Sequence, residues 1–308
     1  MKMNFCFIGL GSIATRHINN LKTILGNDAS IDVLRSGNGK ELSDELNAKI
    51  EKVCYSVSEL EEHYDALFIT NPTSKHYDTL KEHLNRSDFF FVEKPVFERG
   101  DEDISTFVDS GKVIYIACPL RYTNVIQYLK QNVDFSKVYS MRCISSSYLP
   151  DWRPGTDYRN TYSAHKELGG GVSIDLIHEW DYIHYLIGSP VEVKSIIKRK
   201  SDLEIDSDDI AVYIAEYNDK IVELHLDYFG RKTIRRIELF CKDDTITADL
   251  VNQKIVFNKT EKVIDLSQER NEFQIRELEH FLDIVSGKTI CDNDLQEATS
   301  ILRITRGY

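Results

Sequence analysis

One lysine stands where it could stabilise charge on a reacting oxygen. Lys94 lies within Glu93-Lys94-Pro95, directly after the apolar run Phe89-Phe-Phe-Val92, so its side chain projects from the end of a strand that we expect to be buried. An ammonium group in that position can hydrogen-bond a substrate oxygen and stabilise the charge that develops as hydride moves to or from carbon. The alternative is a solvated charged loop that follows the strand.

An aspartate and a histidine share one side of a predicted helix that begins after Gly169-Gly-Gly171 and ends at Gly188. At about 100° per residue, one stripe of this helix is apolar; it consists of Leu176, Trp180, Ile183 and Ile187. The opposite side carries Asp175, His178, Tyr182 and Tyr185. An imidazole titrates near neutral pH, so His178 could exchange a proton with a hydroxyl, and Asp175 could orient it or bind the hydroxyl. The alternative is a solvent-exposed helix.

Glycines at the start of the chain predict a dinucleotide site. The pattern Gly9-x-Gly11-x-x-Ala14 follows an apolar run and opens an amphipathic stretch, which is the context that the motif requires. Gly9 permits the tight turn, Gly11 lets the backbone approach a pyrophosphate, and the helix N-terminus offers free N–H groups. An ordinary glycine turn is the alternative.

The second strand indicates which dinucleotide is preferred. An NAD-selective site places an acidic residue at the end of this strand, but Arg35 and Ser36 stand there, and Asp32 comes too early. A guanidinium beside a hydroxyl suits a 2′-phosphate, which predicts NADP over NAD. Arg35 could instead stack on the adenine and discriminate little. The residues expected at the cofactor are Gly9, Gly11, Ser12, Ile13, Ala14, Arg35, Ser36, Asn71, Pro72, His76, Glu93, Lys94 and Arg121.

A long segment rich in Trp, Tyr and Arg, residues 148–166, has the composition of a sugar site. Flat aromatic faces contact ring C–H groups, polar tips contact hydroxyls, and arginines could grip a phosphate or carboxylate. A dimer contact is the rival interpretation. The residues expected at the substrate are Lys94, Trp152, Arg153, Tyr158, Arg159, Tyr162, Asp175 and His178.

The order of the predicted elements gives an α/β chain with two domains. Over 1–118, apolar runs at 5–8, 31–34, 66–69, 89–92 and 113–117 alternate with helical patterns near 13–25, 40–48, 75–86 and 100–110, which predicts a doubly wound parallel Rossmann sheet. Over 119–308, a helical pattern at 122–132 precedes strands at 138–147, 191–199, 209–217, 220–228 and 234–241. Short turns between these strands predict a mostly antiparallel sheet in a second domain, for substrate binding and oligomerisation. Helical patterns at 269–286 and 294–306 follow.

Composition narrows the class of protein. A formal net charge of −12 argues against nucleic acid as a partner, since phosphate-backbone binding depends on clustered Lys and Arg. No apolar stretch approaches the roughly 20 residues of a membrane span, and no signal peptide precedes the first strand, so we expect a cytoplasmic protein. The six scattered cysteines form no C-x-x-C pair, so we expect reduced thiols and no metal site.

Taken together, these motifs resemble the Gfo/Idh/MocA family of NAD(P)-dependent oxidoreductases. The resemblance rests on the glycine pattern with His17, on Asn71-Pro72-Thr-Ser-x-His76, on Glu93-Lys94-Pro95, and on the glycine-led segment with Asp175, His178 and Asp181. It implies a Rossmann domain and a C-terminal α/β domain with an open sheet used for oligomerisation, as a homodimer or homotetramer. It also implies Lys94 as the catalytic lysine, with Asp175 and His178 as the substrate-binding and acid/base pair. The family spacing D-x-x-x-H is shortened here to D-x-x-H.

The expected activity is hydride transfer between a nicotinamide and a carbinol or carbonyl carbon of a sugar or sugar nucleotide. The segments around Trp152 and Trp180 are similar to a subgroup associated with surface-polysaccharide and nonulosonate synthesis. Two alternatives stay open: a dinucleotide-sensing regulator without chemistry, and a glycosidase that uses tightly held NAD on the same fold.

Overall fold

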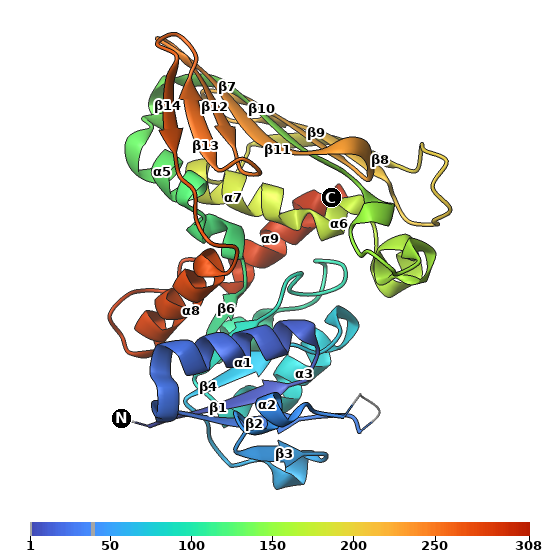
Figure 1. Cartoon of the computed structure of the whole chain (residues 1–308), viewed down its shortest axis with the longest axis vertical. Coiled ribbons are helices and arrows are strands. Elements are labelled where there is room, and N and C mark those ends of the chain that lie inside the picture. Colours follow the sequence, from blue (N-terminus) through green and yellow to red (C-terminus); the bar gives the residue numbers. More distant parts are fainter. Residues whose placement is uncertain (1, 38–40) are drawn as a thin grey trace. The chain divides into compact units, whose positions relative to one another are not determined.

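The structure, a computed structural model, describes residues 2–37 and 41–308 (Figure 1). The chain divides into two compact units, Met1–Pro119 with Gln274–Ser300 and Leu120–Phe273 with Ile301–Tyr308. Residues 274–300, which we expected within the second domain, are thus grouped with the first unit, and the functional boundary after residue 118 stays a prediction. Met1 and residue 40, where one expected helix began, lie outside the described residues.

The first unit contains a six-stranded parallel sheet, as predicted, in the order β3-β2-β1-β4-β5-β6. The strand order reverses between β1 and β4, as in a Rossmann fold. The strands are β1 (Met3–Ile8), β2 (Ala29–Leu34), β3 (Lys52–Cys54), β4 (Ala66–Ile69), β5 (Phe89–Val92) and β6 (Val113–Ile116). The short edge strand β3 had no expected counterpart.

Helices of the first unit follow the expected positions, although two of them are reduced to a single turn. They are α1 (Ser12–Leu25), α2 (Asp44–Asn47), α3 (His76–His83), α4 (Ser105–Val108) and most of α8 (Glu272–Val285), together with the first half of α9 (Leu295–Arg306). Both α2 and α4 form a single turn, where the patterns had indicated 40–48 and 100–110.

A row of aromatic rings fills one side of this sheet. The ring of Phe68 stacks on that of Phe7 at 4.4 Å and on that of Phe91 at 5.0 Å between centroids. From α8, Phe281 meets Phe68 and Phe91 edge-on at 5.7 and 5.2 Å. Ile18 of α1 belongs to the same buried cluster. A helix from near the end of the chain therefore completes the core of the N-terminal sheet.

The second unit holds an eight-stranded sheet in the order β14-β13-β12-β11-β7-β10-β9-β8. Only the β7–β10 pair is parallel, so the sheet is mostly antiparallel, as predicted. Three strands beyond residue 244 had not been predicted. The strands are β7 (Val138–Tyr148), β8 (Glu192–Lys198), β9 (Ile210–Glu216), β10 (Ile221–Asp227), β11 (Phe229–Cys241), β12 (Thr245–Asp249), β13 (Lys254–Phe257) and β14 (Lys262–Asp265).

The helices α5 (Asn124–Asn132), α6 (Val172–Asp175) and α7 (Ile177–Ile187) lie on one face of this sheet (Figure 1). The single helix expected from residue 172 to 187 is wrong, because Leu176 leaves helical geometry (φ −100°, ψ 30°) and separates α6 from α7. The amphipathic pattern is also wrong for Tyr182, which is fully buried rather than on a polar side.

Close packing explains the glycines before α6. A Cβ atom at Gly170 would lie 2.1 Å from the backbone oxygen of Tyr162, and one at Gly171 would lie 2.3 Å from Asp208 Oδ1. Asp208 in turn accepts a hydrogen bond from the backbone N–H of Ser173 at 2.9 Å, which caps the first turn of α6. The glycines therefore let this turn approach the 208 loop and the 162 turn.

No described helix is long and apolar enough to cross a membrane. Within residues 2–37 and 41–308, no group of three or more His, Cys, Asp or Glu side chains is arranged to hold a metal ion.

Candidate active site

Three predicted site segments meet at one edge of the first sheet. Gly9 follows β1, Asn71 follows β4 and Lys94 follows β5, and these strands are neighbours in the sheet. Backbone bonds from Thr70 N to Ile8 O and from Glu93 N to Ile69 O, each 3.0 Å, hold their carboxyl ends in register. At φ +94°, Gly9 comes so close to Asn71 that an added Cβ would lie 2.8 Å from its Cα atom.

The turn after β1 fits a dinucleotide. An added Cβ at Gly11 would meet no protein atom within 4 Å, so the space beside this backbone is open. Helix α1 starts there without a side-chain cap and without an acidic residue in its first turn, so its N-terminal dipole is available to an anion. Asn71 Oδ1, buried at the same edge, has no hydrogen-bond partner within the described part of the chain. These features fit a pyrophosphate at Ser12 and Ile13.

The end of β2 carries the residues expected to select the cofactor. Arg35 directly follows the strand and is held by a 2.9 Å bond from its backbone N–H to the oxygen of Cys54, while Ser36 is exposed. Asp32 is mid-strand and buried, and its carboxylate accepts a 2.9 Å bond from the Tyr64 hydroxyl. Burial raises the pKa of Asp32, so this carboxylate is poorly suited to act as the acidic residue of a ribose site.

Glu93, the residue before Lys94, is held by a contact with His17. His17 Nε2 lies 2.6 Å from Glu93 Oε1, and His17 itself is buried against Phe91. Burial would raise the pKa of Glu93, but the His17 hydrogen bond and the charge of Lys94 outweigh it and hold that pKa below its ordinary value. An ionised Glu93 therefore lies next in sequence to the partly buried Lys94. His76 bonds the backbone oxygens of Asn71 and Val96, at 2.9 and 3.1 Å.

In the second unit, Asp175 is paired with a residue that the sequence had not indicated. Its Oδ2 accepts a 2.5 Å hydrogen bond from the Tyr228 hydroxyl, and both residues are buried. Burial is the main cause that raises the pKa of Tyr228 well above its ordinary value, and the charge of Asp175 adds to it. The Tyr228 hydroxyl therefore stays a donor. Burial and, to a smaller extent, the charge of Asp175 also raise the pKa of Tyr162. Asp175 is therefore a buried carboxylate next to the hydroxyl groups of Tyr228 and Tyr162.

His178 lies in the first turn of α7 and is partly exposed, in contrast to the buried residues on either side of it. One turn further, Asp181 accepts two bonds from Arg121 Nε at 3.0 Å and one from Nη2 at 2.6 Å. Both side chains are 1–2% exposed. Arg121, expected at the cofactor, thus anchors the helix that carries His178.

The aromatic segment is ordered by its own contacts. Trp152 donates from Nε1 to Ser147 Oγ at 2.9 Å, and its ring meets that of Tyr228 edge-on at 5.2 Å. Arg153 lies over the Tyr162 ring at 5.6 Å. Arg159 is bound to Asp157 and Glu204, with closest contacts of 2.8 and 2.9 Å, so its charge is already neutralised.

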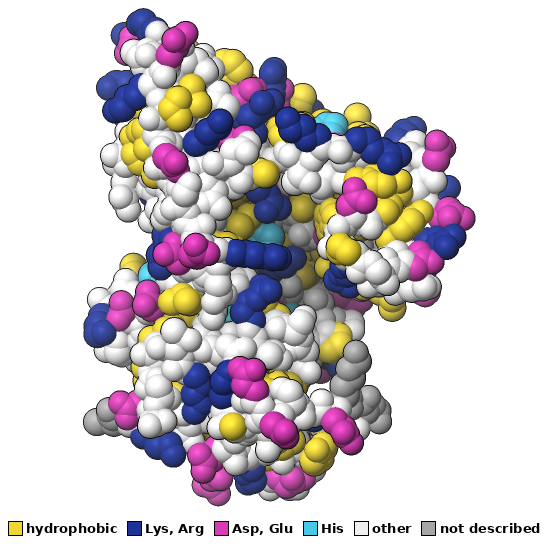
Figure 2. All heavy atoms as spheres, viewed as in Figure 1, with side chains coloured by type: hydrophobic (Ala, Val, Ile, Leu, Met, Phe, Trp, Pro, Cys, Tyr) yellow, Lys and Arg dark blue, Asp and Glu magenta, His cyan; other side chains and the backbone are white. Residues whose placement is uncertain are grey.

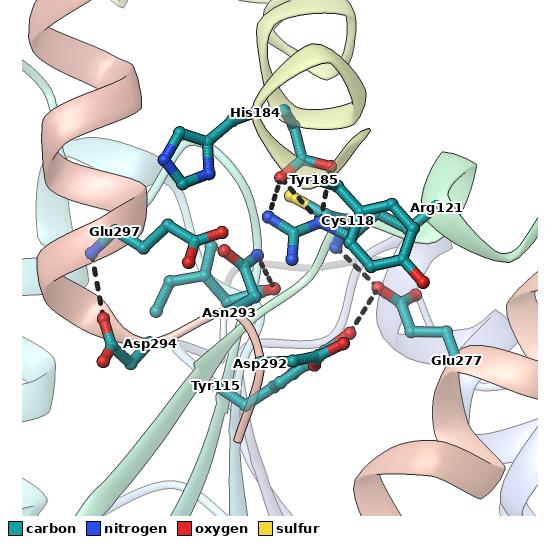
Figure 3. Close-up of polar contacts among 12 residues, drawn as sticks. Tyr115, Cys118, Arg121, His184, Tyr185, Glu277, Asp292, Asn293, Asp294 and Glu297 are labelled. Atoms are coloured by element: carbon teal, nitrogen blue, oxygen red, sulfur yellow. Dashed lines mark hydrogen bonds and ion pairs between the residues drawn. The ribbon is translucent and has the colours of Figure 1, made fainter. Parts of the chain in front are cut away.

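Three further residues position these groups and were missed by sequence reasoning. Besides Tyr228 and Asp208, Glu277 of α8 accepts a 2.6 Å bond from the backbone N–H of Cys118, just beyond β6 (Figure 3). Each acts on a residue far away in the sequence, and no local pattern marks it. All six cysteines carry free thiols, and four of them are buried.

Each of the two units contains a segment that matches a known protein family. Residues 3–117 match the family model described as an oxidoreductase family with an NAD-binding Rossmann fold, and residues 126–247 match the GFO/IDH/MocA C-terminal domain. Among curated proteins, the myo-inositol 2-dehydrogenase of Thermotoga maritima is 27% identical over 203 residues, which cover 62% of this chain and 56% of that protein. The uncharacterised oxidoreductase YrbE of Bacillus subtilis is 24% identical, over 60% and 53% of the two chains. The matches thus span about half the length of these curated relatives.

Solved structures share the whole fold. The UDP-N-acetylglucosamine 3-dehydrogenase GnnA from Acidithiobacillus ferrooxidans superposes with a TM-score of 0.80 at 21% identity, over 99% of this chain and 96% of that one. A levoglucosan dehydrogenase in complex with NADH gives a TM-score of 0.82 at 14% identity, over 100% and 96%. At these identities the likeness concerns the fold alone.

Proposed function

The chain belongs to the Gfo/Idh/MocA family of NAD-binding oxidoreductases, and from this membership we propose that it moves hydride between a nicotinamide and a carbinol or carbonyl carbon of a sugar or sugar nucleotide. The observation that carries the proposal is the arrangement of Gly9, Asn71 and Lys94 at the carboxyl ends of neighbouring strands. When bound, the nicotinamide supplies the hydride acceptor or donor. In this proposal the partly buried Lys94 lies beside the nicotinamide and stabilises the charge on the reacting oxygen of the substrate.

Each side chain has a distinct task in this proposal. Lys94 donates a hydrogen bond to the substrate oxygen and stabilises its developing charge, while the His17–Glu93 pair fixes the backbone from which Lys94 projects. His178 takes or gives the hydroxyl proton. Asp175, held by Tyr228, binds a substrate hydroxyl or orients His178. Gly11 and the N-terminus of α1 bind the pyrophosphate.

Nicotinamide absorbance, measured over a panel of sugars and nucleotide sugars with NAD and NADP, tests this proposal. Lys94→Ala should lower kcat/KM by about 100- to 1,000-fold, the usual cost of one oxyanion donor. Lys81→Ala, an exposed lysine on α3, is the matched control and should turn over normally. Undiminished turnover by the Lys94 variant would exclude this role for Lys94.

We also propose that NADP is preferred over NAD. The support is Arg35 at the end of β2 beside Ser36, together with the burial of Asp32 away from this position. Arg35→Asp should lower kcat/KM for NADP and raise that for NAD, because a carboxylate repels the 2′-phosphate and accepts bonds from the ribose hydroxyls. Equal efficiency of the unmodified protein with both cofactors would contradict the preference.

The finer substrate class is proposed from the relatives. Myo-inositol, UDP-N-acetylglucosamine and levoglucosan dehydrogenases are named among the similar proteins, and all act on polyhydroxylated rings. A sugar nucleotide of surface-polysaccharide synthesis, used in the cytoplasm, remains our prediction. Turnover of sugar nucleotides but not of inositols would support it.

We further propose that the second sheet forms a homodimer or homotetramer. In the described part of the second unit, helices lie on one face of the sheet only, and the other face exposes Ile196, Ile214 and Ile221, which are 64%, 51% and 41% exposed. A sheet face with this many apolar side chains is a typical contact surface. Ile214→Lys should shift the mass measured by analytical ultracentrifugation toward the monomer, whereas Lys194→Gln on the same face should not. A monomeric unmodified protein would refute the proposal.

A further inference from the structure

A groove of about 390 Å³ lies in the second unit. Of the residues proposed to bind the substrate, only Tyr158 lines it. It is formed where β7 ends, where β11 begins, and by the segment that follows β8. Its lining consists of Tyr148, Tyr158, Lys200, Ser201, Asp202, Leu203, Phe229 and Arg231. This volume is within the range of about 300–1,000 Å³ that is usual for small-molecule sites.

The walls of the groove are fixed before any ligand arrives. Tyr148 and Phe229 are register partners across the β7–β11 pair. The segment after β8 is tied to Asp209, whose carboxylate accepts bonds from the backbone N–H groups of Lys200 and Ser201 at 2.7 and 2.8 Å. The Tyr158 hydroxyl accepts a 3.2 Å bond from the backbone N–H of Glu204. A preorganised wall lowers the entropy cost of binding.

Two cations face this groove without a carboxylate partner in the described structure. The guanidinium of Arg231 lies 3.8 Å above the Tyr148 ring centroid, a stacked position that leaves its N–H edges available for hydrogen bonds. Neither Arg231 nor Lys200 forms a side-chain ion pair with any described residue, and Asp202 is the one carboxylate among the lining residues of the described groove. Arg159, the arginine expected to grip a phosphate, is by contrast neutralised by Asp157 and Glu204.

The geometry points to a binding site for a nucleoside phosphate in this groove, separate from the dinucleotide site of the first unit. Arg231 and Lys200 would bind the phosphate, since a guanidinium edge matches two phosphate oxygens. The rings of Tyr148, Tyr158 and Phe229 would contact the base, and such stacking tolerates any base. Figure 2 shows hydrophobic side chains beside Lys and Arg side chains over this end of the second unit. Tyr228, the partner of Asp175, directly precedes Phe229 in the chain.

Isothermal titration of the full chain with UDP, in excess NADP⁺ so that the dinucleotide site is filled, tests this site. We expect saturable binding that is weakened at least tenfold by Arg231→Gln and by Tyr148→Leu. Lys232→Gln is the matched control, because Lys232 is an exposed neighbour in β11 that does not line the groove. Binding of uridine, which has no phosphate, should be unaffected by Arg231→Gln, whereas binding of inorganic phosphate should be weakened by it.

Two results would overturn the site. One is the absence of saturable UDP binding by the unmodified protein, and the other is equal weakening by Arg231→Gln and Lys232→Gln, which indicates a general charge effect. Kinetics then distinguish the source of the ligand. A raised KM for a sugar nucleotide at unchanged kcat in Arg231→Gln identifies the substrate's own nucleotide, and unchanged kinetics with lost UDP binding identify a separate effector. Because binding is measured without turnover, a failure of the proposed catalysis leaves this test intact.

Discussion

The buried ion pair between Arg121 and Asp181 gives a sharp test of how the second unit is held together. Both side chains are at most 2% exposed, and three nitrogen–oxygen contacts of 2.6 to 3.0 Å join them. Asp181→Asn removes one charge with little change in shape, so the buried guanidinium loses the negative charge of this carboxylate. Breaking a buried pair in this way costs about 3–5 kcal/mol of unfolding free energy.

Tryptophan fluorescence in urea measures this loss selectively, since the chain's two tryptophans, Trp152 and Trp180, both lie in the second unit. For a urea dependence of about 2 kcal/mol per molar, the expected cost lowers the midpoint by roughly 1.5–2.5 M. The slope should stay unchanged if the same unit unfolds. Arg121→Met combined with Asp181→Asn should be less destabilised than the sum of the two single variants, by up to about 3 kcal/mol.

Arg142 and Glu223 provide the matched control. They form a 3.0 Å pair on the exposed face of the sheet in the second unit, and their side chains are 52% and 46% exposed. An exposed pair contributes about 0.2–1 kcal/mol, so Glu223→Gln should shift the midpoint by less than about 0.5 M. A shift for Asp181→Asn as small as that for Glu223→Gln would refute the idea that this pair anchors α7.

Three further variants test separate contacts. Tyr228→Phe removes the donor to Asp175 and should cost about 1.5–3 kcal/mol in the fluorescence assay; a neutral result would mean that Asp175 finds another donor. Phe281→Ala should cost about 3–5 kcal/mol in the first unit, followed by far-ultraviolet circular dichroism, and an intact melting temperature would contradict the shared core. Burial lowers the pKa of His83, the charge of Arg86 lowers it further, and the opposing effect of Glu82 at 3.7 Å is smaller, so the folded state resists protonation. Stability should therefore fall as pH drops below about 6.5, by at most about 1.4 kcal/mol per unit, and His83→Gln should flatten that fall.

Local patterns predicted much of the first unit. The strand–glycine–helix start, the apolar runs and the residues at their carboxyl ends are all encoded within short stretches, so β1, α1 and the position of Lys94 could be read from sequence. The parallel first sheet and the mostly antiparallel second sheet followed from the spacing of the runs.

Contacts between distant residues could not be read in this way. Tyr228 binds Asp175 across 53 residues, and Glu204 neutralises Arg159 across 45 residues. The short helix before the break at Leu176 is also held by a distant residue, because Asp208 accepts a hydrogen bond from the backbone N–H of Ser173. An amphipathic wheel assumes one continuous helix and therefore misplaced Tyr182. Whether Asp175 and His178 reach one substrate oxygen stays a prediction.

The contribution of α8 to the N-terminal sheet affects how this protein can be made and divided. A ribosome that has synthesised only the first 119 residues has produced every strand of that sheet but not the helix that brings Phe281 against Phe68 and Phe91. The nascent sheet must wait, with an apolar surface uncovered, until more than 150 additional residues emerge, which is the span from Leu120 to Phe273. A fragment cut after Pro119 should therefore aggregate, whereas supplying residues 274–300 as a separate or fused peptide should rescue it.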